Sequence, residues 1–159
     1  MTHRKLPMAG AIIASVVITA CSDTTGPGNE ARSVNSSAAA PVEITFTKWF
    51  TTFPNMTGFT GGDVAGTFAG QILSLNQFDN GVIVQLQARY EVTDPSGNLS
   101  FKAVIEGTQN NTTGTAVLNG VITEGSLIGS HVHVTFQVIT PCEFGTRNRC
   151  FQGTIRIQG

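Results

Sequence analysis

The chain has 159 residues, of which 12% are charged and 40% apolar, with 18 glycines and a net charge of −1. This length corresponds to one domain. The chain lacks the concentration of Lys and Arg that binding to phosphate backbones requires, so nucleic acid is excluded as a partner. Low charge with abundant Thr, Ser, Asn and Gly is typical of an exported β-protein with a neutral polar surface.

The first twenty residues have the pattern of an export signal. Arg4 and Lys5 precede an apolar run over residues 9–20 that ends in small side chains. A cationic start, a short apolar stretch and a small-residue end are typical of a secretory signal peptide. The run is shorter than the roughly 20 residues that a membrane-spanning helix needs. We therefore predict a signal peptide over residues 1–20.

The signal ends in Ile18-Thr19-Ala20-Cys21, which resembles the lipobox of bacterial lipoproteins. The resemblance implies that Cys21 becomes the acylated N-terminus, and two or three acyl chains anchor a protein stably to a membrane. Ser22 stands where an Asp would favour retention at the inner membrane, so an outer-membrane or cell-surface location is favoured. An ordinary signal peptide with an incidental cysteine is the alternative. Residues 21–40 contain no aromatic residue, and we predict a flexible tether there.

From Pro41 onward, apolar and polar residues alternate with a period of two, which is typical of half-buried strands. The clearest alternation runs from Val82 to Val92, with Arg89 and Glu91 on the outer face. Residues 51–63 are rich in turn-forming residues. We predict strands over residues 42–47, 64–75, 82–92, 99–106, 116–122, 126–139 and 151–157.

These elements predict an all-β domain over residues 41–159. Seven or eight strands in hairpin order, with glycines inside them, favour a single antiparallel up-and-down β-barrel, because closure removes exposed strand edges. A two-sheet β-sandwich is the alternative.

Three stretches also carry a family resemblance: Gly61 to Gly70, the strand around Tyr90, and Gly114 to Gly129. Together they resemble the small calycin-like barrels similar to allene oxide cyclases and dirigent proteins. The resemblance implies the barrel fold for most of residues 42–138. The catalytic residues of the cyclases have no matching positions here, so the resemblance assigns no catalytic residue.

Cys142 and Cys150 flank the loop between the last two predicted strands. We predict a disulfide, which in an oxidising compartment would close a short loop. A redox pair usually has Cys-x-x-Cys spacing, and a zinc site needs two further ligands. Both remain alternatives to a structural bridge.

Other candidate binding residues fall into three groups. His131 and His133 lie on one strand face, about 7 Å apart at Cα, and are candidates for metal ligands. The alternative is a polar outer face, and we predict no cofactor. Arg147 and Arg149 lie at the tip of the last hairpin, where they would bind an anionic partner or remain solvated. An aromatic group would contact an envelope protein or plug one end of the barrel: Trp49, Phe50, Phe53 and Phe59.

The sequence lacks the common motifs of serine hydrolases, phosphate-binding loops, zinc proteases and calcium loops. We therefore expect a membrane-anchored lipoprotein whose barrel is a binding or structural module. The alternative is a cofactor-free isomerase or cyclase, or a lipocalin-like carrier of a small apolar ligand. The interior discriminates between them, because a binding site needs a cavity of some hundreds of Å³. A structural module would be filled by large side chains: Phe46, Phe68, Leu86, Tyr90, Phe101, Phe136 and Phe151.

Overall fold

A computed structural model describes residues 40–145 and 148–159. The predicted signal peptide, Cys21, nearly all of the predicted tether and Arg147 lie outside the described residues. Within this part of the chain, no helix has both the length and the apolar character needed to cross a membrane.

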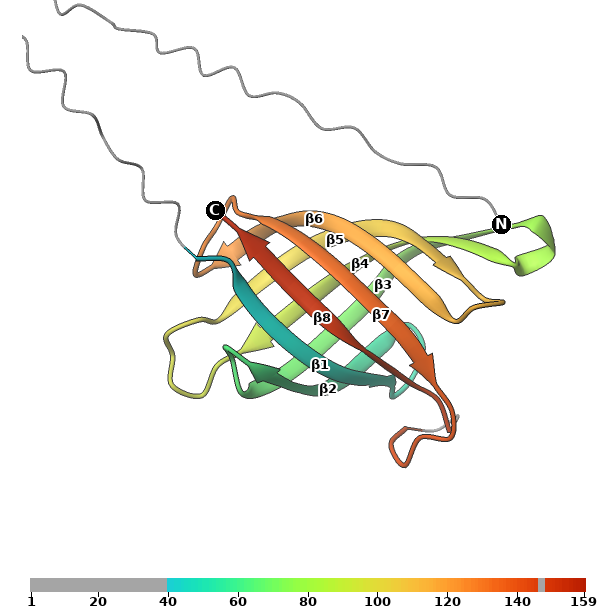
Figure 1. The fold of residues 1–159 in the computed structure, drawn as a ribbon, viewed down its shortest axis with the longest axis horizontal. Coiled ribbons are helices and arrows are strands. Elements are labelled where there is room, and N and C mark those ends of the chain that lie inside the picture. The colour runs from blue at the N-terminus through green and yellow to red at the C-terminus, as the bar shows by residue number, and fades with distance from the viewer. Residues whose placement is uncertain (1–39, 146–147) are drawn as a thin grey trace, which may run out of the picture. The chain divides into compact units, whose positions relative to one another are not determined.

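The domain is a closed barrel of eight antiparallel strands in sequence order, coloured from blue-green to red in Figure 1. A single 3-10 turn, η1 (Asp79–Gly81), joins β3 to β4. The strands are β1 (Val42–Phe50), β2 (Asn55–Gly62), β3 (Gly66–Phe78), β4 (Ile83–Thr93), β5 (Phe101–Asn110), β6 (Thr115–Gly125), β7 (His131–Ile139) and β8 (Cys150–Gln158).

Closure occurs between the first and last strands. Ile44 of β1 lies opposite Ile155 of β8, and Lys48 lies opposite Phe151. Figure 1 shows β1 and β8 crossing the front of the barrel side by side. The predicted up-and-down barrel is therefore confirmed, and the sandwich alternative is wrong.

Two local predictions need correction. Residues 55–62 form β2 rather than turns, and this strand brings the count to eight. Its glycines and threonines give no apolar alternation, but Met56 and Thr60 face inward and are buried. The predicted strand over 126–139 begins only at His131, because Ser126 to Gly129 form a turn in which Leu127 and Gly129 have positive φ.

Glycine allows neighbouring strands to approach closely at Gly153. A Cβ there would lie 1.9 Å from the carbonyl oxygen of Thr135 and 2.7 Å from Cα of Phe136. Only a residue without a side chain fits this contact between β7 and β8. The close approach of β7 and β8 therefore requires glycine at this position.

The interior is apolar along most of its length. All seven side chains predicted to fill a solid core are buried. The predicted outward face of β4 and β5 is also confirmed, since Arg89 is exposed and Lys102 is half-buried while Tyr90 is 1% exposed.

The two ends of the barrel differ. We call the end that holds the β2–β3, β4–β5 and β6–β7 connections the packed end, because Val64 of the β2–β3 connection is buried there at 2% exposure together with Val92 and Phe101. The β1–β2, β3–β4, β5–β6 and β7–β8 connections lie at the opposite end. We call this the open end, and the pocket described below enters the barrel there.

Candidate functional site: a lysine at the base of the open-end pocket

A pocket of about 250 Å³ enters the barrel at the open end. Its rim includes exposed Phe53, Asn111 and Arg149, and its deep part includes buried Lys48 and Tyr90. The pocket therefore connects the surface with the middle of the barrel. Its volume is slightly below the usual range of about 300–1,000 Å³ for small-molecule sites, which suits a ligand smaller than a drug-sized compound.

Lys48 reaches the interior through the alternation of β1. Ile44 and Phe46 point inward, and the next residue of the same parity is Lys48, which is 2% exposed. Its neighbours across the sheet are Gly58 of β2 and Phe151 of β8. The lysine is therefore part of the interior side-chain layer and cannot extend its amine along the outer surface.

Five aromatic rings surround the Lys48 amine, contributed by five different strands. Nζ lies 3.9 Å from the ring centroid of Tyr90, 4.6 Å from Phe136 and 5.0 Å from Phe46. The rings of Phe68 and Phe151 follow at 5.4 and 5.9 Å. We call these rings the aromatic cage. Ring faces attract a cation, with a free energy of about 2 kcal/mol or more for a desolvated pair.

Burial nevertheless acts strongly against the charged form. Desolvation lowers the pKa of Lys48 well below its ordinary value. Among the described residues, no carboxylate forms an ion pair with Nζ and no acceptor takes a hydrogen bond from it. The ring faces partly oppose the lowering of the pKa, but they cannot accept the three N–H bonds as water would.

The described lining of the pocket contains basic and neutral groups only. Lys48 and Arg149 carry the basic groups, Gln77, Gln109 and Asn111 supply amides, and none of these lining residues is Asp or Glu. Tyr90 adds an aromatic ring with a hydroxyl group, and the other lining side chains are apolar: Phe50, Phe53, Met56, Ile72, Leu75, Val84, Leu86, Phe136 and Phe151. This is an apolar site with a few polar groups, the composition typical of ligand-binding pockets.

The predicted aromatic group does not form one surface. Phe50 and Phe53 line the pocket, with ring centroids 5.8 Å apart. Trp49 and Phe59 lie instead on the outer face of the barrel, where the Phe144 ring stacks on Trp49 at 4.7 Å. The prediction of a single partner face or plug is therefore corrected, because successive residues of a strand point to opposite faces.

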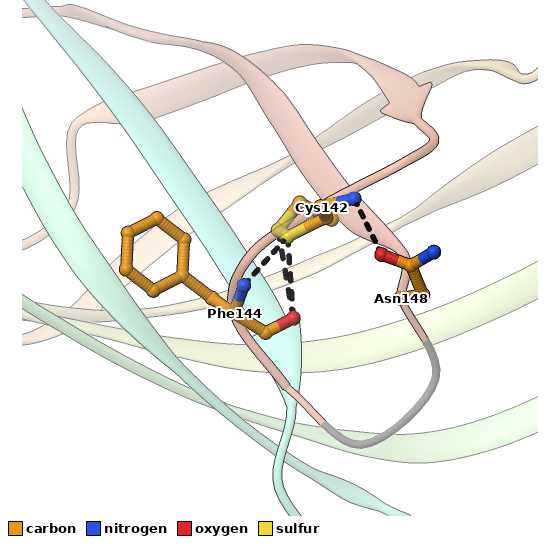
Figure 2. The surroundings of a disulfide bond; sticks show 4 residues. Cys142, Phe144 and Asn148 are labelled. Atoms are coloured by element: carbon orange, nitrogen blue, oxygen red, sulfur yellow. Dashed lines mark hydrogen bonds between the residues drawn. A yellow bond between two sulfur atoms is a disulfide. The ribbon is translucent and has the colours of Figure 1, made fainter.

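Cys142 and Cys150 hold the β7–β8 connection together. Their sulfur atoms lie at disulfide distance, with Cα atoms 5.6 Å apart, so the predicted pair is brought together. Figure 2 shows the surrounding contacts: the Cys142 N–H donates to Oδ1 of Asn148 at 2.9 Å, and the Phe144 N–H lies 3.3 Å from the Cys142 sulfur. Arg149 reaches the pocket from this loop.

The two histidines lie on the outside of the barrel. His131 and His133 line a broad outer groove of about 700 Å³ that also contains Glu106 and Arg156. Nδ1 of His133 lies 2.8 Å from Oδ1 of Asn119. No group of three His, Cys, Asp or Glu in the described ranges is placed to hold a metal ion. Within those ranges, the candidate pair His131 and His133 therefore has no third metal ligand.

Comparisons of the chain with protein-family models, curated proteins and solved structures found no match. The function is therefore inferred from the pocket and its residues.

Lys48 is a site residue that the sequence pattern did not predict. The signal was present, because Ile44, Phe46, Lys48 and Phe50 share one parity on β1. The predicted strand ends at Thr47, where the apolar residues give way to a lysine. A charged residue that continues an inward parity is a functional-site candidate, since a buried lysine without a partner is costly.

Proposed function

We propose that this protein is an exported lipoprotein, anchored to the cell envelope through Cys21, whose barrel binds a small apolar ligand in the open-end pocket. The observation that carries this proposal is the pocket itself, which extends from exposed Phe53 to the aromatic cage. A purely structural module has no need for such a space, since filling it with a larger side chain would add dispersion contacts and stability.

The anchor is tested separately from the pocket. We expect radioactive palmitate supplied to the host to label the wild-type protein and to leave Cys21→Ser unlabelled, because the acyl groups attach to the Cys21 thiol and to its new amine. An unlabelled wild-type protein would contradict the lipoprotein part of the proposal and leave the pocket untouched.

Ligand binding is tested with 3-phenyl-1-propanol, a small apolar probe with one polar group, by titration calorimetry. We expect wild-type protein to bind it and Ile72→Trp to lose binding, because Ile72 lines the pocket and the indole would fill it. Leu73→Trp is the matched control, since Leu73 is 41% exposed and lies outside the pocket lining. Equal binding by both variants, or none by the wild type, would contradict the proposal.

The isomerase or cyclase alternative has one supporting observation. The Lys48 amine is a basic group with a lowered pKa that faces the pocket, and proton transfer needs a positioned group of this kind. Native mass spectrometry of the protein purified from its own host separates the two functions. A carried molecule recovered unchanged favours binding, whereas its conversion on incubation favours catalysis.

A further inference from the structure

The described part of the barrel holds one buried nitrogen nucleophile, and it faces the open-end pocket. The Lys48 amine lies among aromatic rings at the base of this pocket, with 2% of the residue exposed. Lysine amines become useful nucleophiles when an apolar environment keeps them unprotonated. The rest of the pocket lining determines what kind of molecule reaches this amine.

We propose that Lys48 captures a small aldehyde in the open-end pocket as an imine. This inference rests on the proposed function, because the aldehyde must first enter the same pocket. It extends that function from reversible apolar binding to reversible covalent binding, with the chemical class of the ligand specified.

The chemistry balances without any further reactant. The Nζ lone pair attacks the aldehyde carbon and forms a C–N bond, while the C=O π electrons move to oxygen. A proton passes from nitrogen to that oxygen, giving a carbinolamine. Loss of water then forms the C=N bond, and addition of water reverses the step.

Three features of the pocket favour an aldehyde. The ligand is neutral, so it enters an apolar space without carrying a charge out of water. A neutral imine nitrogen carries no N–H, so it presents no donor to the aromatic rings, which are poor acceptors. If the imine is protonated, the aromatic cage presents ring faces to the cation, with the Tyr90 centroid 3.9 Å from Nζ.

Lys102 provides an internal control within the same molecule. It lies on the outer face of β5, 2.8 Å from a carboxylate oxygen of Glu124, and this hydrogen bond raises the pKa of Lys102. Burial lowers the pKa of Lys48 instead. A pKa lower by one raises the unprotonated fraction at neutral pH about tenfold. Burial therefore increases the reactive fraction of Lys48, whereas the hydrogen bond to Glu124 decreases that of Lys102.

The experiment treats full-length protein at pH 7 with 3-phenylpropanal and sodium cyanoborohydride, which reduces an imine to a stable secondary amine. Peptide mapping then measures the modification rate at each lysine. We expect Lys48 to be modified at least tenfold faster than Lys102. We also expect the Lys48 rate to level off with rising pH well before the Lys102 rate does. Modification of Lys48 at the Lys102 rate or more slowly would overturn the inference.

Variants and a competitor sharpen the result. Lys48→Met should abolish the fast modification, and Lys102→Met should leave it unchanged. The alcohol 3-phenyl-1-propanol, which has the same apolar body and no carbonyl, should slow modification of Lys48 and not of Lys102. Because the ratio of the two lysines is measured within the wild-type molecule, the conclusion does not depend on whether a variant folds.

The outcomes separate this inference from the proposed function. If the alcohol binds to the wild-type protein and Lys48 shows no fast modification, the imine inference is wrong and apolar binding stands. If the alcohol does not bind and Lys48 shows no fast modification, both are wrong.

Discussion

The packed end and the open end of this barrel are built from the same eight strands and differ in what fills them. At the packed end, Ile44 and Val92 are fully buried, and Val64 of the β2–β3 connection packs with the core. At the open end, the side chains leave a pocket whose base is Lys48. The difference shows that one closed sheet holds both a solid core and a pocket, because the inward side chains fill the barrel at one end and leave space at the other.

The packed end contributes more to the free energy of unfolding than the open end does. A side chain next to a cavity lacks contacts on one side. Burial of the Lys48 amine disfavours its charged form and adds a further cost. Such costs are typical of positions that serve binding or catalysis rather than folding.

Removing matched aliphatic volume at each end tests this difference most strongly. Ile44→Ala at the packed end should cost about 4 kcal/mol of unfolding free energy, within the usual 2–5 kcal/mol range. Leu86→Ala, beside the pocket, should cost about 2 kcal/mol, since Leu86 already borders empty space. Urea denaturation measures both. A larger loss of unfolding free energy for Leu86→Ala than for Ile44→Ala would show that the open end is packed as tightly as the packed end.

The Cys142–Cys150 pair lies in the β7–β8 connection, so its removal tests the open end alone. The two residues are 8 apart in the chain, so the bridge closes a short loop worth about 2.5 kcal/mol in the chain-entropy estimate. The double variant Cys142→Ser/Cys150→Ser should lose roughly this amount and weaken ligand binding, because Arg149 of this loop lines the pocket. Thiol titration of the folded, unreduced protein provides the check on pairing, since two reactive thiols would contradict it.

Lys48→Met should stabilise the protein, since it replaces a buried amine with an apolar side chain of similar length. Below its ordinary pKa of about 10.4, an unfolded Lys48 binds a proton that the native state, with its lowered pKa, resists. Stability of the wild type should therefore rise with pH between the lowered pKa and about 10.4. The rise should be about 1.4 kcal/mol for each pH unit in that range.

The measurement is the urea midpoint of wild type, Lys48→Met and Lys102→Met across pH 6 to 10. The rise should be absent from Lys48→Met and retained in Lys102→Met. A wild-type curve that runs parallel to that of Lys48→Met would show that Lys48 keeps an ordinary pKa in the native state.

The smallest effect on stability is expected at the rim. Phe53 is 58% exposed and packs on Phe50. Phe53→Ser should change the unfolding free energy by no more than about 0.5 kcal/mol, while weakening 3-phenyl-1-propanol binding because the ring lines the pocket. Phe78→Ser, at a 53% exposed position outside the pocket lining, is the control. Equal binding by the two variants would show that the Phe53 side chain does not contribute to ligand binding.

The sequence by itself determined the all-β class and most of the strands, because side-chain alternation is a local property of each strand. The period of two from Val82 to Val92 shows which residues face inward, and Asp94 and Gly97 show where the chain turns, without knowledge of any neighbouring strand. The lipobox around Cys21 is also a local pattern, and it remains a prediction about residues outside the described part of the chain. The strand β2 was not predicted because its inward positions are Met56 and Thr60, and its glycines serve contacts with other strands.

Only the tertiary structure decided the candidate site. The aromatic cage consists of rings from β1, β3, β4, β7 and β8, which are far apart in the sequence and meet at Lys48 because the barrel closes. Trp49 and Phe50 belong to different sites because Trp49 points to the outer face of the closed sheet and Phe50 points into the pocket. Long-range contacts of this kind follow from closure and register, which a residue-by-residue pattern does not encode.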